Sequence, residues 1–144
     1  MVDSKREAQL NETLELFHFA FRAFTAKPDK VLEARGLARV HHRILYFVAR
    51  NPNLTVSALL SILAVTKQAL NAPLRQLVEM GLVESRTAHD DRRQRLLRLT
   101  LEGERLERAL SGAQRKKMAN AFERLGPDAE RYWRLVIAKV AEER

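Results

Sequence analysis

The chain has 144 residues, no cysteine and a formal net charge of +8. The lack of cysteine excludes disulfides, thiolate metal sites, cysteine nucleophiles and thiol-based redox sensing. No apolar run approaches the roughly 18 residues of a transmembrane helix. No apolar core follows the first residues as in a signal peptide, so we expect a cytoplasmic protein with no membrane partner.

The positive charge is concentrated in the middle of the chain. Residues 36–100 carry ten basic and four acidic side chains, whereas residues 1–35 are balanced and residues 101–144 carry a net charge of +2. A basic central module between nearly neutral flanks favours a polyanion as the partner. Charge alone is equally compatible with an ordinary basic surface.

Two amphipathic helices are expected in the first third of the chain. Apolar residues recur at steps of three and four from Leu10 to Phe24, which is one face of a long helix. We expect this helix to end near Pro28, because proline disfavours the helical conformation in the residue before it. A second apolar stripe, from Leu37 to Phe47, predicts the second helix.

The next segment has the organisation of a helix-turn-helix. Thr55 can cap one short helix, Thr66 can cap the next, and Gly81 stands where a left-handed residue would end the second one. Pro73 lies inside the second helix, where it removes one backbone hydrogen bond. We therefore expect a kink near residues 69–73.

Two extended segments follow, at 82–86 and 95–99, and a polar, charged tip joins them. They predict a β-hairpin. Thr100 can then cap another helix, and Gly126 separates it from a last helix that contains Trp133. The predicted fold is mainly α with a small β-hairpin wing, a winged helix-turn-helix flanked by N- and C-terminal helices.

The helix that follows Thr66 offers a polar face to duplex DNA. Its polar side chains share a sector of roughly 100° on a helical wheel, away from Leu70 and Leu77. Their amide and cationic groups match base edges in the major groove, although an ordinary solvated helix face is the alternative. The candidate recognition residues are Thr66, Lys67, Gln68, Asn71 and Arg75.

Helix starts and the hairpin supply further candidate contacts. Thr55 and Ser57 begin the preceding helix, where hydroxyls and backbone amides can hold phosphate as well as cap the helix. The wing candidates, for the minor groove or for phosphate, are Arg86, His89, Arg92, Arg93 and Arg95. We expect Asp91 to organise the wing by pairing with Arg93 or with a basic residue of the recognition helix.

The wing region resembles that of the MarR family of bacterial and archaeal regulators. The resemblance is carried by Gly81-Leu82-Val83-Glu84, by Asp90-Asp91-Arg92-Arg93, and by Leu96-Leu97-Arg98-Leu99-Thr100 with Gly103. The order of elements is similar along nearly the whole chain. The family's wing often reads D-x-R-D-x-R, but here the first position is Ala88 and the third is Asp90. The tip arginine is therefore displaced, and Arg86 or Arg92 would have to substitute for it.

The resemblance implies a homodimer whose two winged modules read a pseudo-palindromic operator in double-stranded DNA. Members of the family commonly repress, and they often release DNA when a small aromatic ligand binds between the dimerisation and DNA-binding regions. The long apolar stripes of the first and last helices support a dimer independently, because one chain offers little to cover them. The expected regions are 1–35 and 101–144 for dimerisation, with the winged helix-turn-helix at 36–100 between them.

The helices that would flank such a ligand carry aromatic and histidine side chains. The candidates are Phe17, His18, Phe21, His42 and Tyr46. Dimer core for the phenylalanines and surface positions for the histidines are the alternative, which we favour. No cofactor or metal is expected, because His41 and His42 point to different sides of their helix and no histidines lie four residues apart.

The sequence therefore predicts a homodimeric, sequence-specific transcription regulator, most simply a repressor. An enzyme is not expected, because the sequence shows no nucleophile–base pair, glycine-rich phosphate loop or metal cluster. One alternative is a nonspecific or architectural DNA-binding protein, whose binding would be almost wholly electrostatic and would collapse with salt. Another is a protein-interaction module, which would tolerate the loss of Arg75 or Arg92.

Overall fold

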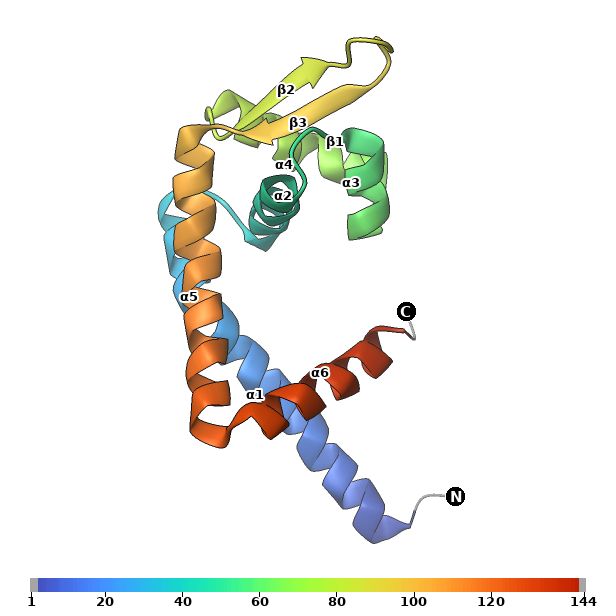
Figure 1. The fold of residues 1–144 in the computed structure, drawn as a ribbon, viewed down its shortest axis with the longest axis vertical. Coiled ribbons are helices and arrows are strands. Elements are labelled where there is room, and N and C mark those ends of the chain that lie inside the picture. The colour runs from blue at the N-terminus through green and yellow to red at the C-terminus, as the bar shows by residue number, and fades with distance from the viewer. Residues whose placement is uncertain (1–2, 143–144) are drawn as a thin grey trace.

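The computed structural model describes residues 3–142, which form six helices and three short strands (Figure 1). In chain order they are α1 (Ser4–Ala34), α2 (Arg39–Arg50), β1 (Leu54–Thr55), α3 (Val56–Leu63), α4 (Lys67–Glu79), β2 (Val83–Thr87), β3 (Arg95–Leu99), α5 (Leu101–Leu125) and α6 (Pro127–Ala141). The mainly α fold with a hairpin wing is confirmed. None of the described helices is long and apolar enough to cross a membrane.

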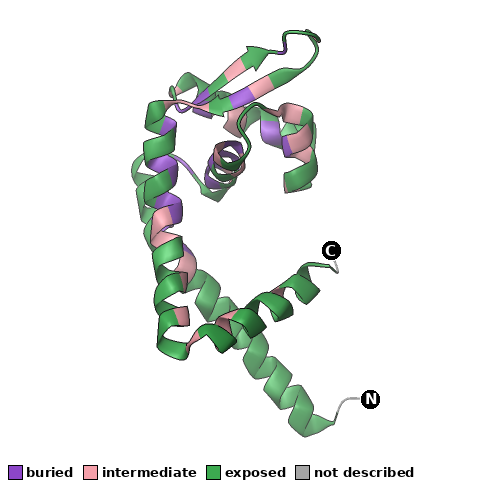
Figure 2. Ribbon diagram, viewed as in Figure 1, coloured by how far each residue is buried: buried purple, intermediate pink, exposed green. Residues whose placement is uncertain are grey.

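The hydrophobic core lies in the winged module and the adjoining half of α5. Figure 2 shows the buried residues gathered there, whereas α6 and the N-terminal half of α1 are exposed. Burying one large aliphatic side chain stabilises a fold by about 1.5–3 kcal/mol. α1 contributes Leu32 to this core, and α5 contributes Leu106 and Leu110. The winged module contributes Leu37, Ile44, Leu45, Val48, Leu59, Leu70, Leu77, Leu82, Val83 and Leu97.

Three threonines begin the helices that the sequence assigned to them. The hydroxyl oxygens of Thr55, Thr66 and Thr100 each accept a hydrogen bond of 3.0 Å from the backbone N–H three residues further on. Each bond satisfies a donor that the first turn would otherwise leave unpaired. The predicted starts of α3, α4 and α5 are confirmed.

The small sheet has one strand more than the predicted hairpin. Its order is β1-β3-β2, with both pairs antiparallel, and Leu54 pairs with Leu97 in register. β1 has only two residues, too few to show an alternating pattern in the sequence. It ties the loop before α3 to the middle of the wing.

The first helix does not end near Pro28, and that expectation was wrong. α1 continues through Pro28 to Ala34. Proline lacks only one backbone donor, and burial of Pro28 and Leu32 favours continuation of the helix against the module. The helix ends instead at Ala34, and the chain turns at Gly36, whose φ of +71° suits glycine.

The recognition helix also continues through a proline. Pro73 lies within α4, which ends at Glu79, and Gly81 follows with a φ of +74°. The Gly81 N–H donates to the Val78 carbonyl and the Leu82 N–H donates to the Leu77 carbonyl, both at 3.0 Å. This is the left-handed helix end that the sequence predicted. The kink near Pro73 stays a prediction.

Candidate functional site

The exposed side of α4 carries the candidate recognition residues. Thr66, Lys67, Gln68, Asn71 and Arg75 are all exposed. On the other side of the helix, the two leucines predicted to pack inward are fully buried. The packing of α4 thus leaves two amides, an ammonium and a guanidinium available on one surface, which are groups that match base edges.

The start of α3 lies in the same module. Thr55 is half-buried and its hydroxyl oxygen is engaged by the Ala58 N–H, whereas Ser57 is exposed. A capping hydroxyl keeps its own O–H free to donate, so capping does not exclude a phosphate contact. Both residues are placed where an anion would meet a helix N-terminus.

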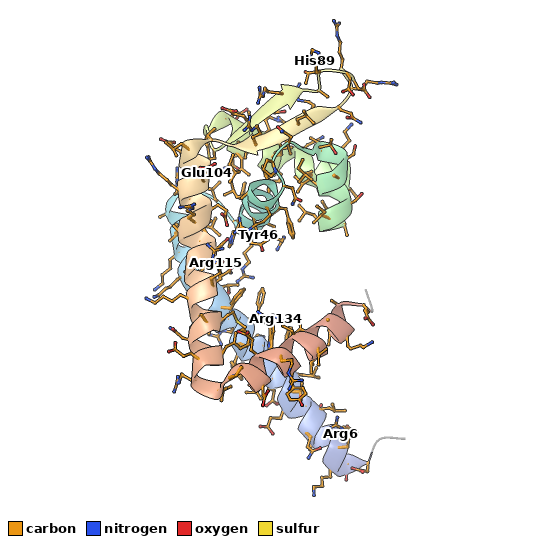
Figure 3. The ribbon with its side chains drawn as sticks, in the orientation of Figure 1. Arg6, Tyr46, His89, Glu104, Arg115 and Arg134 are labelled. Atoms are coloured by element: carbon orange, nitrogen blue, oxygen red, sulfur yellow. The ribbon has the colours of Figure 1, made fainter. Side chains whose placement is uncertain are left out.

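All five basic candidates of the wing are exposed, but Arg95 also forms hydrogen bonds across the hairpin. Arg86, His89, Arg92 and Arg93 are exposed, and Figure 3 places His89 at the tip of the hairpin. Arg95 differs, because its Nε donates to Ser85 Oγ at 2.7 Å and a terminal nitrogen donates to the Ser85 carbonyl at 3.3 Å. Arg95 therefore joins the two strands of the wing.

Asp91 pairs with Arg93, one of the two partners that the sequence analysis left open. Its Oδ1 accepts a hydrogen bond of 3.0 Å from the Arg93 backbone N–H and lies 3.7 Å from Arg93 Nε. An ion pair this exposed stabilises the fold little. The backbone bond over two residues is a turn-forming contact, so Asp91 shapes the tip.

The two adjacent histidines point to different sides of α2, as predicted. His41 Nε2 lies 2.9 Å from Gln76 Oε1 on α4, and His42 Nε2 lies 3.0 Å from Ser111 Oγ on α5. Within residues 3–142, no three histidine, aspartate or glutamate side chains form a group that could hold a metal ion.

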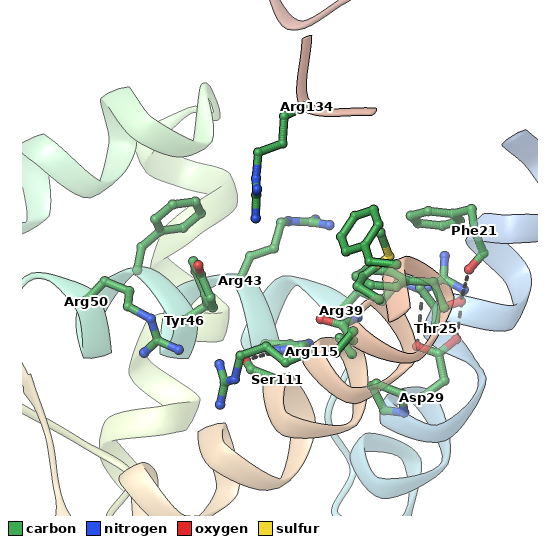
Figure 4. A pocket seen from close by; sticks show the side chains of 18 of the residues that line it. Phe21, Thr25, Asp29, Arg39, Arg43, Tyr46, Arg50, Ser111, Arg115 and Arg134 are labelled. Carbon is green, nitrogen blue, oxygen red and sulfur yellow. Dashed lines mark hydrogen bonds and ion pairs between the residues drawn. The ribbon is translucent and has the colours of Figure 1, made fainter. Parts of the chain in front are cut away.

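A cavity of about 750 Å³ separates the winged module from the distal helices (Figure 4). Its wall is formed by residues of α1, α2, α5 and α6. Of the five ligand candidates, Phe21, His42 and Tyr46 line it. Phe17 and His18 are exposed on the preceding part of α1 and are not among the lining residues.

Residues 32–94 match the MarR family model. The chain is also 47% identical over 131 residues to the HTH-type transcriptional regulator PetP of Rhodobacter capsulatus, a match that covers 91% of this chain and 79% of PetP. The chain belongs to the MarR family. It is a winged-helix DNA-binding protein of transcription regulation.

Solved structures of the family have the same fold. The chain superposes on NadR in complex with 4-hydroxyphenylacetate with a TM-score of 0.72 at 23% identity, covering 91% of this chain and 92% of NadR. It superposes on a mutant of S. aureus MepR bound to an oligodeoxyribonucleotide with a TM-score of 0.64 at 18% identity, covering 90% and 96%. At these identities the likeness establishes the fold alone.

In this MarR-family protein, the sequence candidates omitted the arginines of the cavity. The lining arginines are Arg39, Arg43, Arg50, Arg115 and Arg134. Three of them, with Tyr46, recur on α2 at steps of four, three and four, which is one helical face. That spacing was a signal in the sequence, but only the tertiary structure shows that this face lines a cavity.

Three of these arginines are held by carboxylates. Asp29 accepts two hydrogen bonds from Arg39, at 3.1 and 2.8 Å, and Glu107 accepts two from Arg50, both at 3.2 Å. These hydrogen bonds raise the pKa of both guanidinium groups above the ordinary arginine value. Arg134 pairs with Glu130 at 3.0 Å.

Arg43 and Arg115 differ, because neither forms an ion pair with any residue that the structure describes. Figure 4 shows both side chains beside Tyr46, with Arg134 approaching from α6. Aromatic rings and uncompensated positive charge therefore meet in one space. Such a lining suits a flat, anionic molecule.

His42 is buried in the cavity wall, so the surface position favoured for it in the sequence analysis was wrong. Burial lowers its pKa below the ordinary histidine value. Glu107 opposes that shift, and the smaller effect of Arg43 adds to it. Through its contact with Ser111, His42 joins α2 to α5.

Proposed function

We propose that this protein is a homodimeric repressor that acts in the cytoplasm and reads a pseudo-palindromic operator, one half-site per subunit. The observation that carries the proposal is the two-sided character of α4. Its candidate recognition side chains are exposed opposite fully buried leucines, so the helix is anchored while its polar face is available to the major groove.

In this proposal, Lys67, Gln68, Asn71 and Arg75 contact base edges. Thr66, Thr55 and Ser57 hold phosphates at the helix starts. The wing reaches the minor groove or phosphate through its exposed basic residues. Since Arg95 is already bonded to Ser85, Arg86 or Arg92 is the better candidate for the minor groove.

A second copy of the chain would cover the exposed apolar surface. Large hydrophobic side chains on α1 and α6 are unusually accessible, with exposed fractions of 68% for Leu14, 60% for Phe17, 58% for Leu135 and 61% for Val136. Apolar surface of this extent marks an association site in soluble proteins. A symmetric pair would also present two recognition helices to two half-sites.

Fluorescence anisotropy tests the DNA-binding proposal. DNA from upstream of the protein's own gene is compared with scrambled DNA at about 50 and 200 mM salt. We expect a preference for the upstream DNA that persists at the higher salt. Asn71→Ala and Arg75→Ala should each weaken it by about 1–3 kcal/mol. Asn120→Ala and Arg124→Ala, at exposed positions of α5, are the matched controls.

Equal binding to both DNAs that disappears with salt would favour the nonspecific or architectural alternative. No binding at low salt would contradict the proposal and favour a protein-interaction module. An unchanged preference in both α4 variants would remove α4 as the reading element.

We also propose that a small aromatic anion enters the cavity and releases the protein from DNA. Support comes from the aromatic lining, from the uncompensated Arg43 and Arg115, and from the NadR complex with 4-hydroxyphenylacetate.

Calorimetry would compare 4-hydroxyphenylacetate with 4-methylphenol, which has the ring without the carboxylate. We expect 4-hydroxyphenylacetate to bind and 4-methylphenol not to bind. Arg43→Ala and Arg115→Ala should each abolish the binding of 4-hydroxyphenylacetate, whereas Arg105→Ala, at an exposed position of α5, is the control. Equal binding of both compounds would contradict the role of charge.

A further inference from the structure

A three-element junction on the inner side of α4 is separate from both the DNA-binding face and the cavity. It joins Gln76 of α4, His41 of α2 and the turn at Gly36 that ends α1. His41 has an exposed fraction of only 6%, so its ring is enclosed by the winged module.

The hydrogen bonds of the junction determine where the hydrogen atoms lie. His41 Nδ1 accepts the Ala38 backbone N–H at 2.9 Å, so it carries a lone pair. In the neutral ring the hydrogen is then on Nε2, which donates to Gln76 Oε1 at 2.9 Å. This orients the Gln76 amide so that its Nε2 donates to the Gly36 carbonyl at 3.3 Å. Each bond therefore requires the one before it.

The turn at Gly36 is a firm anchor for this chain of bonds. The Gly36 N–H donates to the Glu33 carbonyl at 3.0 Å and the Leu37 N–H donates to the Leu32 carbonyl at 2.8 Å. Leu32 and Leu37 are both buried in the core. This paired pattern is a well-defined helix end, so the Gly36 carbonyl has a fixed position relative to α1.

Gln76 directly follows Arg75, one of the residues proposed to read bases. At 100° per residue, the two side chains leave α4 on adjacent faces of the same turn. A bond that holds Gln76 to the end of α1 therefore holds the rotation and the distance of α4 relative to α1. α1 in turn carries much of the apolar surface assigned to the dimer.

We propose that His41 and Gln76 are positioning residues that set the separation of the two recognition helices, and so the half-site spacing that the dimer accepts. The inference rests on the proposed homodimer. Half-site separation on DNA is a geometric property of the protein, because each recognition helix must enter the major groove on the same side of the duplex. Loss of the junction broadens the accepted spacing before it abolishes binding.

The test uses the full-length protein and DNA selected by that protein. A random duplex library is enriched on the wild type, and the enriched duplex is remade with one base pair inserted at its centre. The measured quantity is the Kd for the duplex with the inserted base pair divided by the Kd for the enriched duplex. We expect Gln76→Met to reduce this ratio by about tenfold, which corresponds to one or two hydrogen bonds. Val78→Met, at an exposed position of the same helix, should keep it.

A second variant distinguishes the contact of His41 with Gln76 from its capping of the Ala38 N–H. A glutamine at the third position of a helix can accept the N–H of the capping residue, so His41→Gln retains a partner for Ala38 and loses the ring N–H. We expect His41→Gln to reduce the ratio as Gln76→Met does. The Kd ratio of the double variant should fall no further than that of either single variant, because each single variant already breaks the link between His41 and Gln76.

Three results would overturn the inference. An unchanged ratio in Gln76→Met, with DNA binding otherwise normal, would remove the junction from spacing control and leave the proposed function intact. Additive losses in the double variant would show two independent effects. A wild type that binds both spacings equally would overturn the pseudo-palindromic reading together with this inference. Nitrogen-15 NMR of the histidine ring adds a check without DNA, since a hydrogen on His41 Nδ1 would contradict the geometry.

Discussion

At the scale of single residues, His42 shows how burial turns an ordinary histidine into a pH-dependent element of stability. Its ring lies between α2 and α5 with Ser111 as its hydrogen-bond partner. Burial lowers its pKa, so the folded protein favours the neutral ring more than the unfolded chain does. Its contribution to stability is then fully present above the ordinary pKa of 6.5.

We therefore predict that this contribution is lost as the pH falls from the ordinary histidine pKa toward the lower folded value. Urea unfolding of the wild type between pH 7.5 and about 5 measures the change in the free energy of unfolding. In His42→Asn the slope over that range should be shallower. Identical slopes in the two proteins would exclude His42 as the titrating group.

Gly103 is a residue whose side chain, a single hydrogen, is required by packing. A Cβ built on Gly103 would overlap the carbonyl oxygen of Leu82, where the end of α4 meets the start of α5. Gly112 lies on the same helix, and a Cβ there would meet nothing within 4 Å. The two glycines therefore form a matched pair for one substitution.

We predict that Gly103→Ala lowers the free energy of unfolding by about 1–3 kcal/mol, because the backbone must move to admit the methyl group. Gly112→Ala should be neutral or stabilising by up to about 1 kcal/mol, because alanine favours the helix. Thermal and urea unfolding compare them. Equal effects from both substitutions would contradict the packing argument.

At the scale of elements, α2 is joined to α5 by an ion pair with unequal burial. The Glu107 side chain is 4% exposed, whereas that of Arg50 is 39% exposed and lies over the Tyr46 ring at 4.5 Å. If Glu107 is removed, Arg50 can turn toward water. If Arg50 is removed, the Glu107 carboxylate stays buried without its partner, which costs more free energy.

We predict that Arg50→Ala destabilises the protein by about 2–4 kcal/mol and Glu107→Ala by only about 1–2 kcal/mol. Urea unfolding at pH 7.5 measures both losses. A larger cost for Glu107→Ala would contradict the burial argument.

At the scale of the whole molecule, the winged module buries its apolar side chains in a core, whereas the distal helices leave many of theirs exposed. Figure 2 shows α6 and the N-terminal half of α1 exposed along their length. Trp133, Val136 and Val140 share one side of α6, whereas Arg131 and Leu135 lie on the other side. In the proposed dimer, the second copy would cover the side that carries Trp133 and Val136.

We predict that Val136→Glu converts a dimer to a monomer, because it places a charge in the apolar interface. Light scattering after size-exclusion chromatography measures the mass, and DNA affinity should fall as the second half-site is lost. Arg105→Glu, at an exposed position of α5 outside the apolar faces of α1 and α6, is the control. A wild type that is monomeric at micromolar concentration would contradict the covered-surface argument.

The sequence by itself determined the types and most of the limits of the elements. The capping threonines, the glycine at the end of α4 and the spacing of apolar residues act over a few positions, so their effects can be read locally. The same local logic predicted the exposed polar face of α4 and the pairing of Asp91 with Arg93. The roles of those residues on DNA stay predictions.

Only the tertiary structure decided the features that join distant parts of the chain. Arg50 and Glu107 are 57 positions apart, His42 and Ser111 are 69 apart, and His41 and Gln76 are 35 apart. No local pattern encodes such contacts, because they depend on how helices pack. Packing also extended α1 through Pro28 and gathered the arginines around one cavity. Periodicity identifies the face of a helix, whereas folding decides what that face meets.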